Sequence, residues 1–213
     1  MDEFAKSNLQ KRIDRTMENL KKNSMDTYYV STKEEALKQA AVLMKDGDTV
    51  ACGGSMTLFE AGVIDYLRGG RFQFLDRYEE GLTREQTEQI FRESFFADDY
   101  LVSSNAITEE GELYNVDGNG NRVAAMIYGP KSVIVIAGYN KIVKNREAAI
   151  QRVRSVAAPA NTARLNCATP CKKTGECMDC KGDGRICCSY VFLGKQRVKG
   201  RIKVILVGEE LGY

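Results

Sequence analysis

The chain has 213 residues, 43% of them hydrophobic and 28% charged, and its 31 basic side chains nearly balance its 29 acidic ones. This composition predicts one main globular domain and provides no basic field for a nucleic-acid partner. The chain contains no histidine, which excludes Ser-His-Asp catalysis, Cys-His catalysis and every imidazole metal ligand. No apolar run approaches the ~20 residues of a membrane helix, and the first residues lack the apolar stretch of a secretory signal, so we expect a cytoplasmic protein with no membrane partner.

The first part of the chain predicts two units of helix and strand. Apolar residues at near-helical spacing make residues 1–24 an amphipathic helix, which packs on the body of the protein or on a second copy in a homodimer. Residues 28–31 are predicted to form a short strand, and Thr32 with Glu35 caps a helix that Gly47 ends. TVAC then predicts a strand that stops at paired glycines, and SMTLFEAGVIDYL predicts the next helix.

The middle of the chain mixes helix and hairpin signals. FQFLD predicts a strand, and Thr83 with Gln86 caps a helix whose buried side carries Ile90 and Phe91. From Asp99 onward, YLVSSNAI, GELYNVD and RVAAMIY are short β-like runs. The turn sequences EEG and GNGN separate these runs, so we expect an antiparallel hairpin here.

The last part returns to alternating strands and helices. KSVIVIAG has the continuous, branched apolar run of a fully buried strand, and REAAIQRVRSVA predicts a helix that ends before Pro159. SYVFLG and RIKVILVG predict a final pair of strands. Strands that alternate with helices predict an α/β fold with a mostly parallel sheet flanked by helices, together with the antiparallel hairpin and a cysteine-rich C-terminal segment.

Two polar stretches follow predicted strands. Gly53 and Gly54 let backbone amides approach an anion, and Ser55 and Thr57 add hydroxyls; the alternative is an ordinary turn that Ser55 caps. The hairpin region contributes Asn105, Thr108, Glu109, Asp117, Asn119, Asn121 and Arg122. Ligands of open α/β sheets bind beyond the carboxyl ends of the strands, so we expect both stretches to face one crevice. The alternative for the second stretch is a solvated hairpin whose polar residues only make turns.

Six of the seven cysteines lie within residues 167–188. The order C-x5-C-x2-C-x6-C makes a four-thiolate set of Cys171, Cys177, Cys180 and Cys187, with Cys167 and Cys188 as alternatives. Such a set accepts zinc or an iron–sulfur cluster, and spacing does not choose between these metals. The alternative is a loop of reduced or disulfide-linked cysteines. No organic cofactor is identifiable.

These stretches resemble the LUD domain family, the lactate utilization proteins. The resemblance is carried by GGSMTL at 53–58, the run at 103–130, KSVIVIAGYNKIV at 131–143 and the cysteine tail. It makes residues 25–213 one LUD-like α/β domain that includes the cysteine-rich segment. It implies a fold similar to ribose-5-phosphate isomerase and the CoA transferases, in which a glycine and hydroxyl turn after an early strand holds a phosphate or carboxylate. It also implies a part in oxidising L-lactate to pyruvate beside iron–sulfur partner proteins.

Three functional hypotheses follow. In the first, the crevice binds a small anionic metabolite for organic-acid oxidation, through the turn at Gly54 and Ser55 and with Arg122 or Lys131 as counter-charges. In the second, the chain is a non-catalytic, metal-stapled binding or regulatory protein. In the third, it is a CoA transferase or phosphosugar isomerase. Glu109 is the candidate acid or base, or the nucleophile if the chemistry is CoA transfer.

Overall fold

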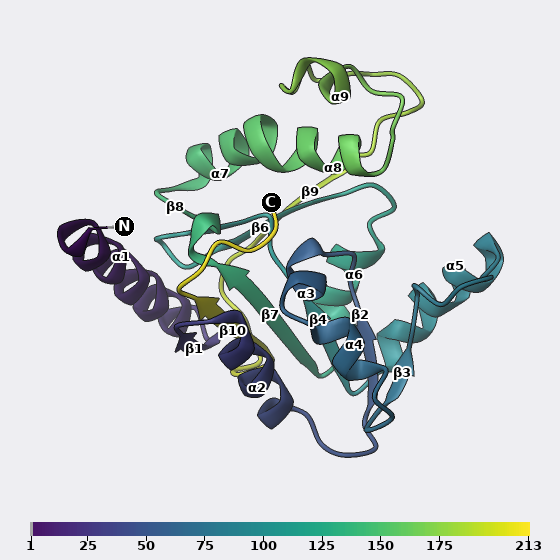
Figure 1. Cartoon of the computed structure of the whole chain (residues 1–213), viewed down its shortest axis with the longest axis horizontal. Helices are drawn as coiled ribbons and strands as arrows, with labels where there is room; N and C mark the ends of the chain where they lie inside the picture. Colours follow the sequence, from purple (N-terminus) through teal and green to yellow (C-terminus); the bar gives the residue numbers. More distant parts are fainter. Residues whose placement is uncertain (1) are drawn as a thin grey trace.

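Two sheets form the centre of the computed structural model, which describes residues 2–213 (Figure 1). The larger sheet is parallel throughout and has the order β1 (Asp26–Val30), β10 (Ile202–Val207), β7 (Ser132–Gly138), β4 (Asp99–Val102), β2 (Thr49–Cys52) and β3 (Gln73–Leu75). The smaller, mixed sheet has the order β8 (Ile142–Val143), β5 (Ala106–Thr108), β6 (Leu113–Asp117) and β9 (Ser189–Leu193). The predicted α/β fold with a mostly parallel sheet is confirmed.

The helices fill the connections between the strands. They are α1 (Glu3–Lys22), α2 (Lys33–Leu43), α3 (Met56–Glu60), α4 (Val63–Leu67), α5 (Arg84–Glu93), α6 (Asn121–Tyr128), α7 (Arg146–Arg152), α8 (Ala158–Arg164) and α9 (Pro170–Thr174). Two 3₁₀ helices (Ser94–Phe96 and Tyr139–Lys141) and one π-helical turn (Val153–Ala157) complete the set.

Alternation along the central strands creates a core on each face of the larger sheet. In β7, Val133, Val135 and Ala137 pack on the side of α1, α6 and the smaller sheet, whereas Ile134 and Ile136 pack on the side of α2, α3 and α4. Successive strand side chains point to opposite faces, so a strand covered on both sides needs apolar residues at every position. The smaller sheet in turn carries the layer of α7 and α8 on its outer face (Figure 1).

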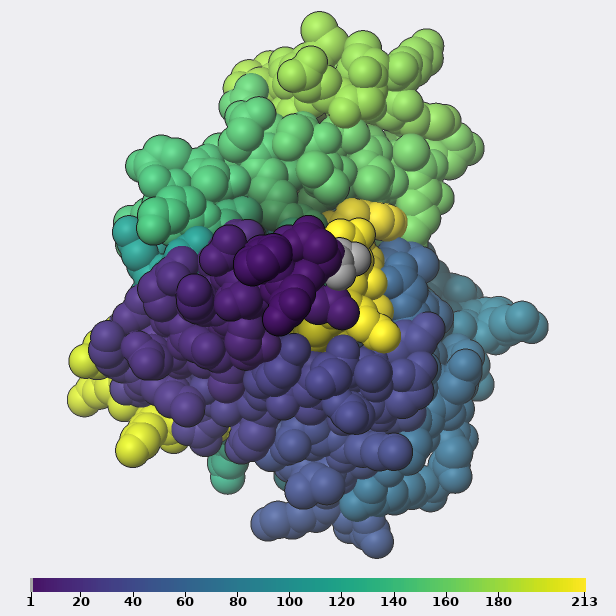
Figure 2. Space-filling view, turned by 60° about the vertical axis from the view of Figure 1, so that its left-hand side comes forward, coloured from purple at the N-terminus to yellow at the C-terminus, as the bar shows by residue number. Residues whose placement is uncertain are grey.

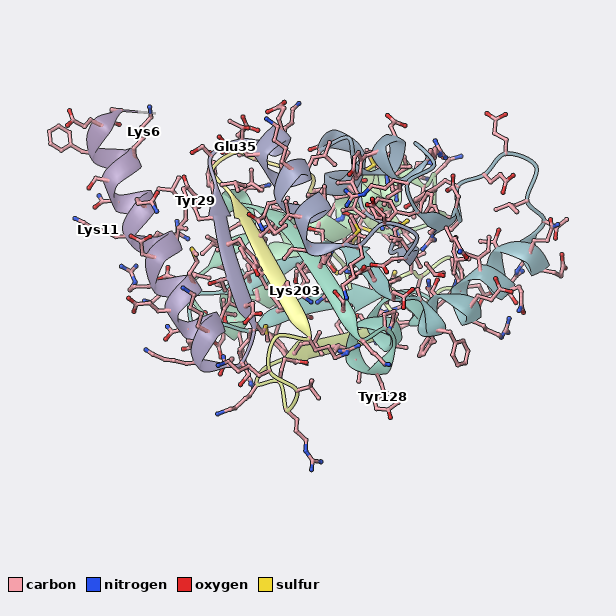
Figure 3. The ribbon with its side chains drawn as sticks, turned by 90° about the horizontal axis from the view of Figure 1, so that it is seen from below. Lys6, Lys11, Tyr29, Glu35, Tyr128 and Lys203 are labelled. Atoms are coloured by element: carbon pink, nitrogen blue, oxygen red, sulfur yellow. The ribbon has the colours of Figure 1, made fainter. Side chains whose placement is uncertain are left out.

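Helix α1 is fixed to the body by one buried stripe and one buried carboxylate. Ile13, Thr16 and Leu20 are buried, whereas Lys11 lies on the exposed outer side of the helix (Figure 3). Arg12 and Arg15 on α1 both donate to the carboxylate of Glu109, at 3.2 and 2.8 Å. The opening helix is therefore part of the packed domain.

The sequence RVAAMIY forms helix α6 rather than the expected strand. Gly120 precedes the helix in a left-handed conformation (φ 78°), and the carboxylate of Asp117 accepts a hydrogen bond from the backbone of Val123 in the first turn. The buried positions Val123 and Met126 are three residues apart, which is a helical spacing. A run of only seven residues is too short to distinguish this spacing from the alternation of a strand.

Four smaller expectations also change. The helix expected at 55–67 is divided into α3 and α4 by Gly62, and Ile90 and Phe91 of α5 are only half-buried. The helix expected to end before Pro159 continues through it: the π-helical turn Val153–Ala157 runs directly into α8, and the carbonyl oxygen of Arg154, five residues before Pro159, accepts from the backbone N–H of Cys177 instead. The final two strands belong to different sheets: β9 pairs with β6, and β10 pairs with β1 and β7.

Within residues 2–213, no helix has the length and apolar character needed to cross a membrane.

Gly111 allows α1 to approach the hairpin between β5 and β6. Its φ is +84°, and a Cβ atom there would lie 2.6 Å from the carbonyl oxygen of Asn19. Gly81 has nearly the same φ, +85°, but no atom within 4 Å of such a Cβ.

We therefore expect Gly111→Ala to lower the free energy of unfolding by more than Gly81→Ala, which should lose only the ~1–2 kcal/mol of left-handed backbone strain. Urea denaturation of both variants measures the difference. Equal losses would show that the close contact with α1 contributes nothing.

Candidate functional site

A cavity of about 350 Å³ lies beyond the carboxyl ends of the parallel strands. Its lining includes Gly54 and Ser55 after β2, Arg77 and Tyr78 after β3, Ser103 and Asn105 after β4, Lys141 after β7 and Tyr213 after β10. The π-helical turn and α8 form the opposite wall with Val153, Ala157 and Arg164. This is the edge of an α/β sheet at which ligands bind, so the two predicted polar stretches do meet.

The glycine turn faces this cavity. Gly53 has no room for a side chain, because a Cβ atom would lie 2.9 Å from Val102 and 3.0 Å from Arg122. Ser55 precedes α3 but makes no capping hydrogen bond, and its buried hydroxyl has no partner within the described residues. The alternative of a simple capped turn therefore does not account for Ser55. Helix α3 has only five residues, so binding at this turn depends mainly on side chains.

Arg122 ties together the strand ends on one side of the cavity. The guanidinium is buried, with Nε 2.8 Å from Asp117 Oδ1 and Nη1 2.6 Å from Asn115 Oδ1. It also donates to the side chain of Asn105 and to the carbonyl oxygens of Ser103 and Val116. Its five N–H groups are thus all engaged, and Asp117 neutralises its charge. Arg122 is therefore a clamp in the cavity wall more than a free counter-charge.

Lys141 is the buried amine of the cavity. Only 2% of the residue is exposed, and its Nζ donates to Thr57 Oγ1 at 2.8 Å and to Ser103 Oγ at 2.9 Å. Burial lowers its pKa to about 7, and the charges of Arg152 and Arg122 lower it further. An ammonium group has three N–H donors, so one remains for a ligand. Thr57 reaches the site only through this contact, because it does not itself line the cavity.

Arg77 covers the glycine turn from the other side. Its guanidinium lies over the rings of Phe91 and Tyr78, at 4.4 and 5.4 Å from their centroids, and its Nη1 would lie 3.8 Å from a Cβ on Gly54. Its buried Nε has no hydrogen-bond partner within the described residues. Aromatic packing thus holds a guanidinium at the cavity with donor capacity unused.

Polar groups without partners concentrate at this cavity. Five buried side-chain nitrogen or oxygen atoms of the described chain lack a partner, and three of them belong to the cavity residues Ser55, Arg77 and Tyr213. Four basic side chains line the cavity against one acidic side chain, Asp117. Buried polar groups normally have partners. The cavity is therefore suited to an anion with several acceptor atoms.

Other predicted site residues lie elsewhere. Glu109 does not line the cavity; burial acts to raise its pKa, but hydrogen bonds from Arg15 and Arg12 outweigh burial and hold the pKa below its usual range. The hydroxyl of Thr108 accepts a hydrogen bond from the backbone of Glu112 in the hairpin. Lys131 is exposed beside the amino end of β7, the opposite end of the sheet from the cavity. Asn119 and Asn121 line the cavity with Asn105.

The cysteine segment follows α8 and forms one end of the molecule (Figure 2). Cys171, Cys177, Cys180 and Cys187 line one small cavity, whereas Cys167 and Cys188 do not. Burial raises the pKa of the Cys187 thiol to about 11, and the neighbouring Cys177, Cys171 and Cys180 raise it as well. All of the cysteines are free thiols. Among the described residues, no group of three or more His, Cys, Asp or Glu side chains is arranged to hold a metal ion.

The family model described as the LUD domain matches residues 13–207. The chain belongs to the LUD domain family. A search of curated proteins finds no match. The LUD family is associated with lactate utilization.

This LUD chain is similar to two solved structures. The crystal structure of a DUF162 family protein from Deinococcus radiodurans has 16% identity and a TM-score of 0.55, and the match covers 93% of this chain and 98% of that chain. The crystal structure of eIF2B delta from Chaetomium thermophilum has 20% identity and a TM-score of 0.37, and covers 55% of this chain and 50% of that one. At these identities, the first similarity supports the LUD fold alone.

Sequence reasoning missed five basic or phenolic groups of the LUD cavity: Arg77, Tyr78, Lys141, Arg164 and Tyr213. Arg77 and Lys141 come two and three residues after strands β3 and β7, so the rule that ligands bind at carboxyl strand ends, applied to every strand, would have found them. Arg164 is brought in by the continuation of α8 through Pro159, which no local signal indicated.

The Asp117–Arg122 pair should carry a large part of the local stability. Asp117→Ala leaves a buried guanidinium without its counter-charge, so we expect a loss of about 3–5 kcal/mol in the free energy of unfolding. Asp65→Ala is the control, because Asp65 is 89% exposed and lies 3.9 Å from Arg68; it should change stability by less than about 1 kcal/mol. Chemical denaturation measures the free energy of unfolding of both variants. Similar losses in the two variants would contradict the role of Arg122 as a clamp.

Proposed function

We propose that this LUD protein binds a small organic acid in the cavity beyond the carboxyl strand ends, as one component of an organic-acid oxidation system such as that for lactate. The observation that carries the proposal is the concentration of unpartnered polar groups around one cavity, with Ser55, Arg77 and Tyr213 all lacking partners among the described residues. A carboxylate offers two oxygens with several lone pairs, which matches several separate donors.

The donors are arranged for an anion that enters between the sheet and α8. Lys141 supplies the buried ammonium at the sheet side, Arg77 supplies a guanidinium held on two aromatic rings, and exposed Arg164 lies at the α8 side. Charge-assisted hydrogen bonds of this kind are roughly twice as strong as neutral ones. The Ser55 and Tyr213 hydroxyls lack partners among the described residues and are available to the remaining polar atoms of the acid.

The association of the LUD family with lactate utilization supports lactate or pyruvate as the ligand class. Oxidation of a 2-hydroxy acid removes two electrons, which no side chain of the cavity accepts by itself. Iron–sulfur partner proteins therefore remain part of the proposal as electron acceptors, and the chain supplies the binding step.

The CoA-transferase alternative receives no support from the position of Glu109. A carboxylate nucleophile has to reach the ligand, but this carboxylate is bound by Arg12 and Arg15 of α1, and Lys144 lies 3.8 Å from it. We propose instead that Glu109 anchors α1 to the hairpin. The carboxylate that does line the cavity, Asp117, is occupied by Arg122 and by the backbone of Val123.

Lys141→Met should weaken binding of the acid without unfolding the protein, because it removes the ammonium but keeps an unbranched side chain. A charge-assisted hydrogen bond contributes about 1.5–3 kcal/mol, so we expect a dissociation constant about 10- to 100-fold higher. Isothermal titration calorimetry with L-lactate, pyruvate and phosphate measures this constant. Lys144→Met is the control, because Lys144 is 77% exposed and does not line the cavity. Failure of all three anions to bind the wild-type protein, or equal affinities for wild type and Lys141→Met, would contradict the proposal.

The affinity for a carboxylate should also depend on pH. The pKa of Lys141 is about 7, lowered mainly by burial, so the amine is charged below pH 7 and increasingly neutral above it. Because an anion binds the charged form, affinity should be greatest below pH 7 and decrease by up to about tenfold per unit as the pH rises above it. The ligand carboxylate does not titrate in this range. Titrations from pH 6 to 8.5 test the slope, which Lys141→Met should abolish; an unchanged slope in this variant would assign the titration to another group.

A further inference from the structure

The cavity of the cysteine segment has the size of a single ion. Its volume is about 20 Å³, and Cys171, Cys177, Cys180 and Cys187 all line it. A space of roughly 10–15 Å³ is enough for one water molecule. Four thiols from four positions along the segment thus meet around a space for one small guest.

Local contacts hold the four cysteines around this space. Cys171 is buried, with its sulfur 3.3 Å from the Thr162 hydroxyl of α8. The backbone N–H of Cys177 donates to the carbonyl oxygen of Arg154, at 3.1 Å. Arg185 donates to the carbonyl oxygens of Cys180 and Cys187 and so joins the last two cysteines.

The segment has almost no apolar core to account for this arrangement. Cys171 is its one buried hydrophobic residue, and Met178 is 63% exposed. A segment of this composition is normally ordered by disulfides or a metal, and all the cysteines here are free thiols. Arg185 also lines the cavity, and a guanidinium beside thiolates offsets their negative charge.

We propose that Cys171, Cys177, Cys180 and Cys187 form a four-thiolate metal centre that shares a wall with the organic-acid cavity. Three residues, Ala158, Ile186 and Cys187, line both cavities. The four cysteine side chains do not form a coordinating group in this arrangement, so their sulfur atoms have to move inward when the metal binds. Thiolate sulfurs favour zinc over harder metals, and the small space takes a single ion.

The shared wall is connected to the clamp of the first cavity. The backbone N–H of Cys188 donates to the carbonyl oxygen of Asp117, at 2.8 Å. A Cβ on Gly118 would lie 3.3 Å from the carbonyl oxygen of Ile186. A metal that fixes Cys187 therefore fixes the chain at Asp117, whose carboxylate binds Arg122. In this arrangement the metal organises the wall against which the acid binds.

Metal content of protein purified without oxygen tests the ligand set. Elemental analysis, acid-labile sulfide and the visible spectrum are measured on wild type, Cys180→Ser and the control Cys188→Ser, since Cys188 is exposed in the same segment but does not line the cavity. We expect one centre per chain in wild type and in Cys188→Ser, and a loss of most of the metal in Cys180→Ser. Circular dichroism confirms that each variant is folded.

One zinc per chain without colour supports the single-ion thiolate centre as a structural element. Iron with acid-labile sulfide means a cluster, which a space of about 20 Å³ does not hold, and overturns the single-ion site. Absence of metal after supplementation with zinc, or with iron and sulfide, overturns the proposal. Equal loss of metal in Cys180→Ser and Cys188→Ser overturns the ligand set.

The shared wall has its own test, which does not depend on the ligand of the larger cavity. Hydrogen exchange followed by mass spectrometry compares metal-loaded protein with chelator-treated protein. We expect at least tenfold slower exchange in the loaded form for the peptide that contains Asp117 to Asn121, whereas a peptide from α2, which packs on the opposite face of the larger sheet, should be unchanged. The same exchange rate at Asp117 in both forms overturns the coupling, and a missing organic-acid affinity overturns only the proposed function.

Discussion

The guanidinium of Arg122 joins segments that are far apart in the sheet order but meet at the cavity. It reaches Ser103 and Asn105 after β4, and Asn115, Val116 and Asp117 in β6. Ser103 and Asn105 lie in the connection from β4 of the larger sheet to β5 of the smaller sheet, so one side chain ties this connection to strand β6 beside the cavity. Gly53 is required for the same reason, because only a glycine leaves room for the arginine.

The pairing of Arg122 with Asp117 leaves anion binding to other side chains of the cavity. A charged group whose donors are all bound to the protein can position a wall without attracting a ligand strongly, and it also repels the buried amine of Lys141. Burial, and then the charges of Arg152 and Arg122, lower the pKa of Lys141 to about 7, near its transition between charged and neutral forms. In the proposed function, recognition of an anion rests on Lys141, Arg77 and Arg164, which come from three separate parts of the chain and meet only in the folded protein.

Local sequence signals predicted those parts of the structure that depend on local chemistry. The capping box of Thr83 and Gln86, the buried strand β7 and the hairpin of β5 and β6 all follow from short-range patterns and are observed. The four cysteines chosen by spacing are the four that share a cavity. Helix α6 was assigned wrongly, because its decisive contact, from Asp117 to the first turn, depends on tertiary structure more than on its own composition.

The position of Glu109 shows why site residues are harder to predict than elements. Its sequence context, a carboxylate in a polar hairpin after a buried strand, is the same as that of Asp117, eight positions later. The two differ in what lies opposite: α1 brings Arg12 and Arg15 to Glu109, and α6 brings Arg122 to Asp117 at the cavity. Alternation along a hairpin and the docking of one helix on each side decide which carboxylate faces the ligand, and neither is encoded within the hairpin itself.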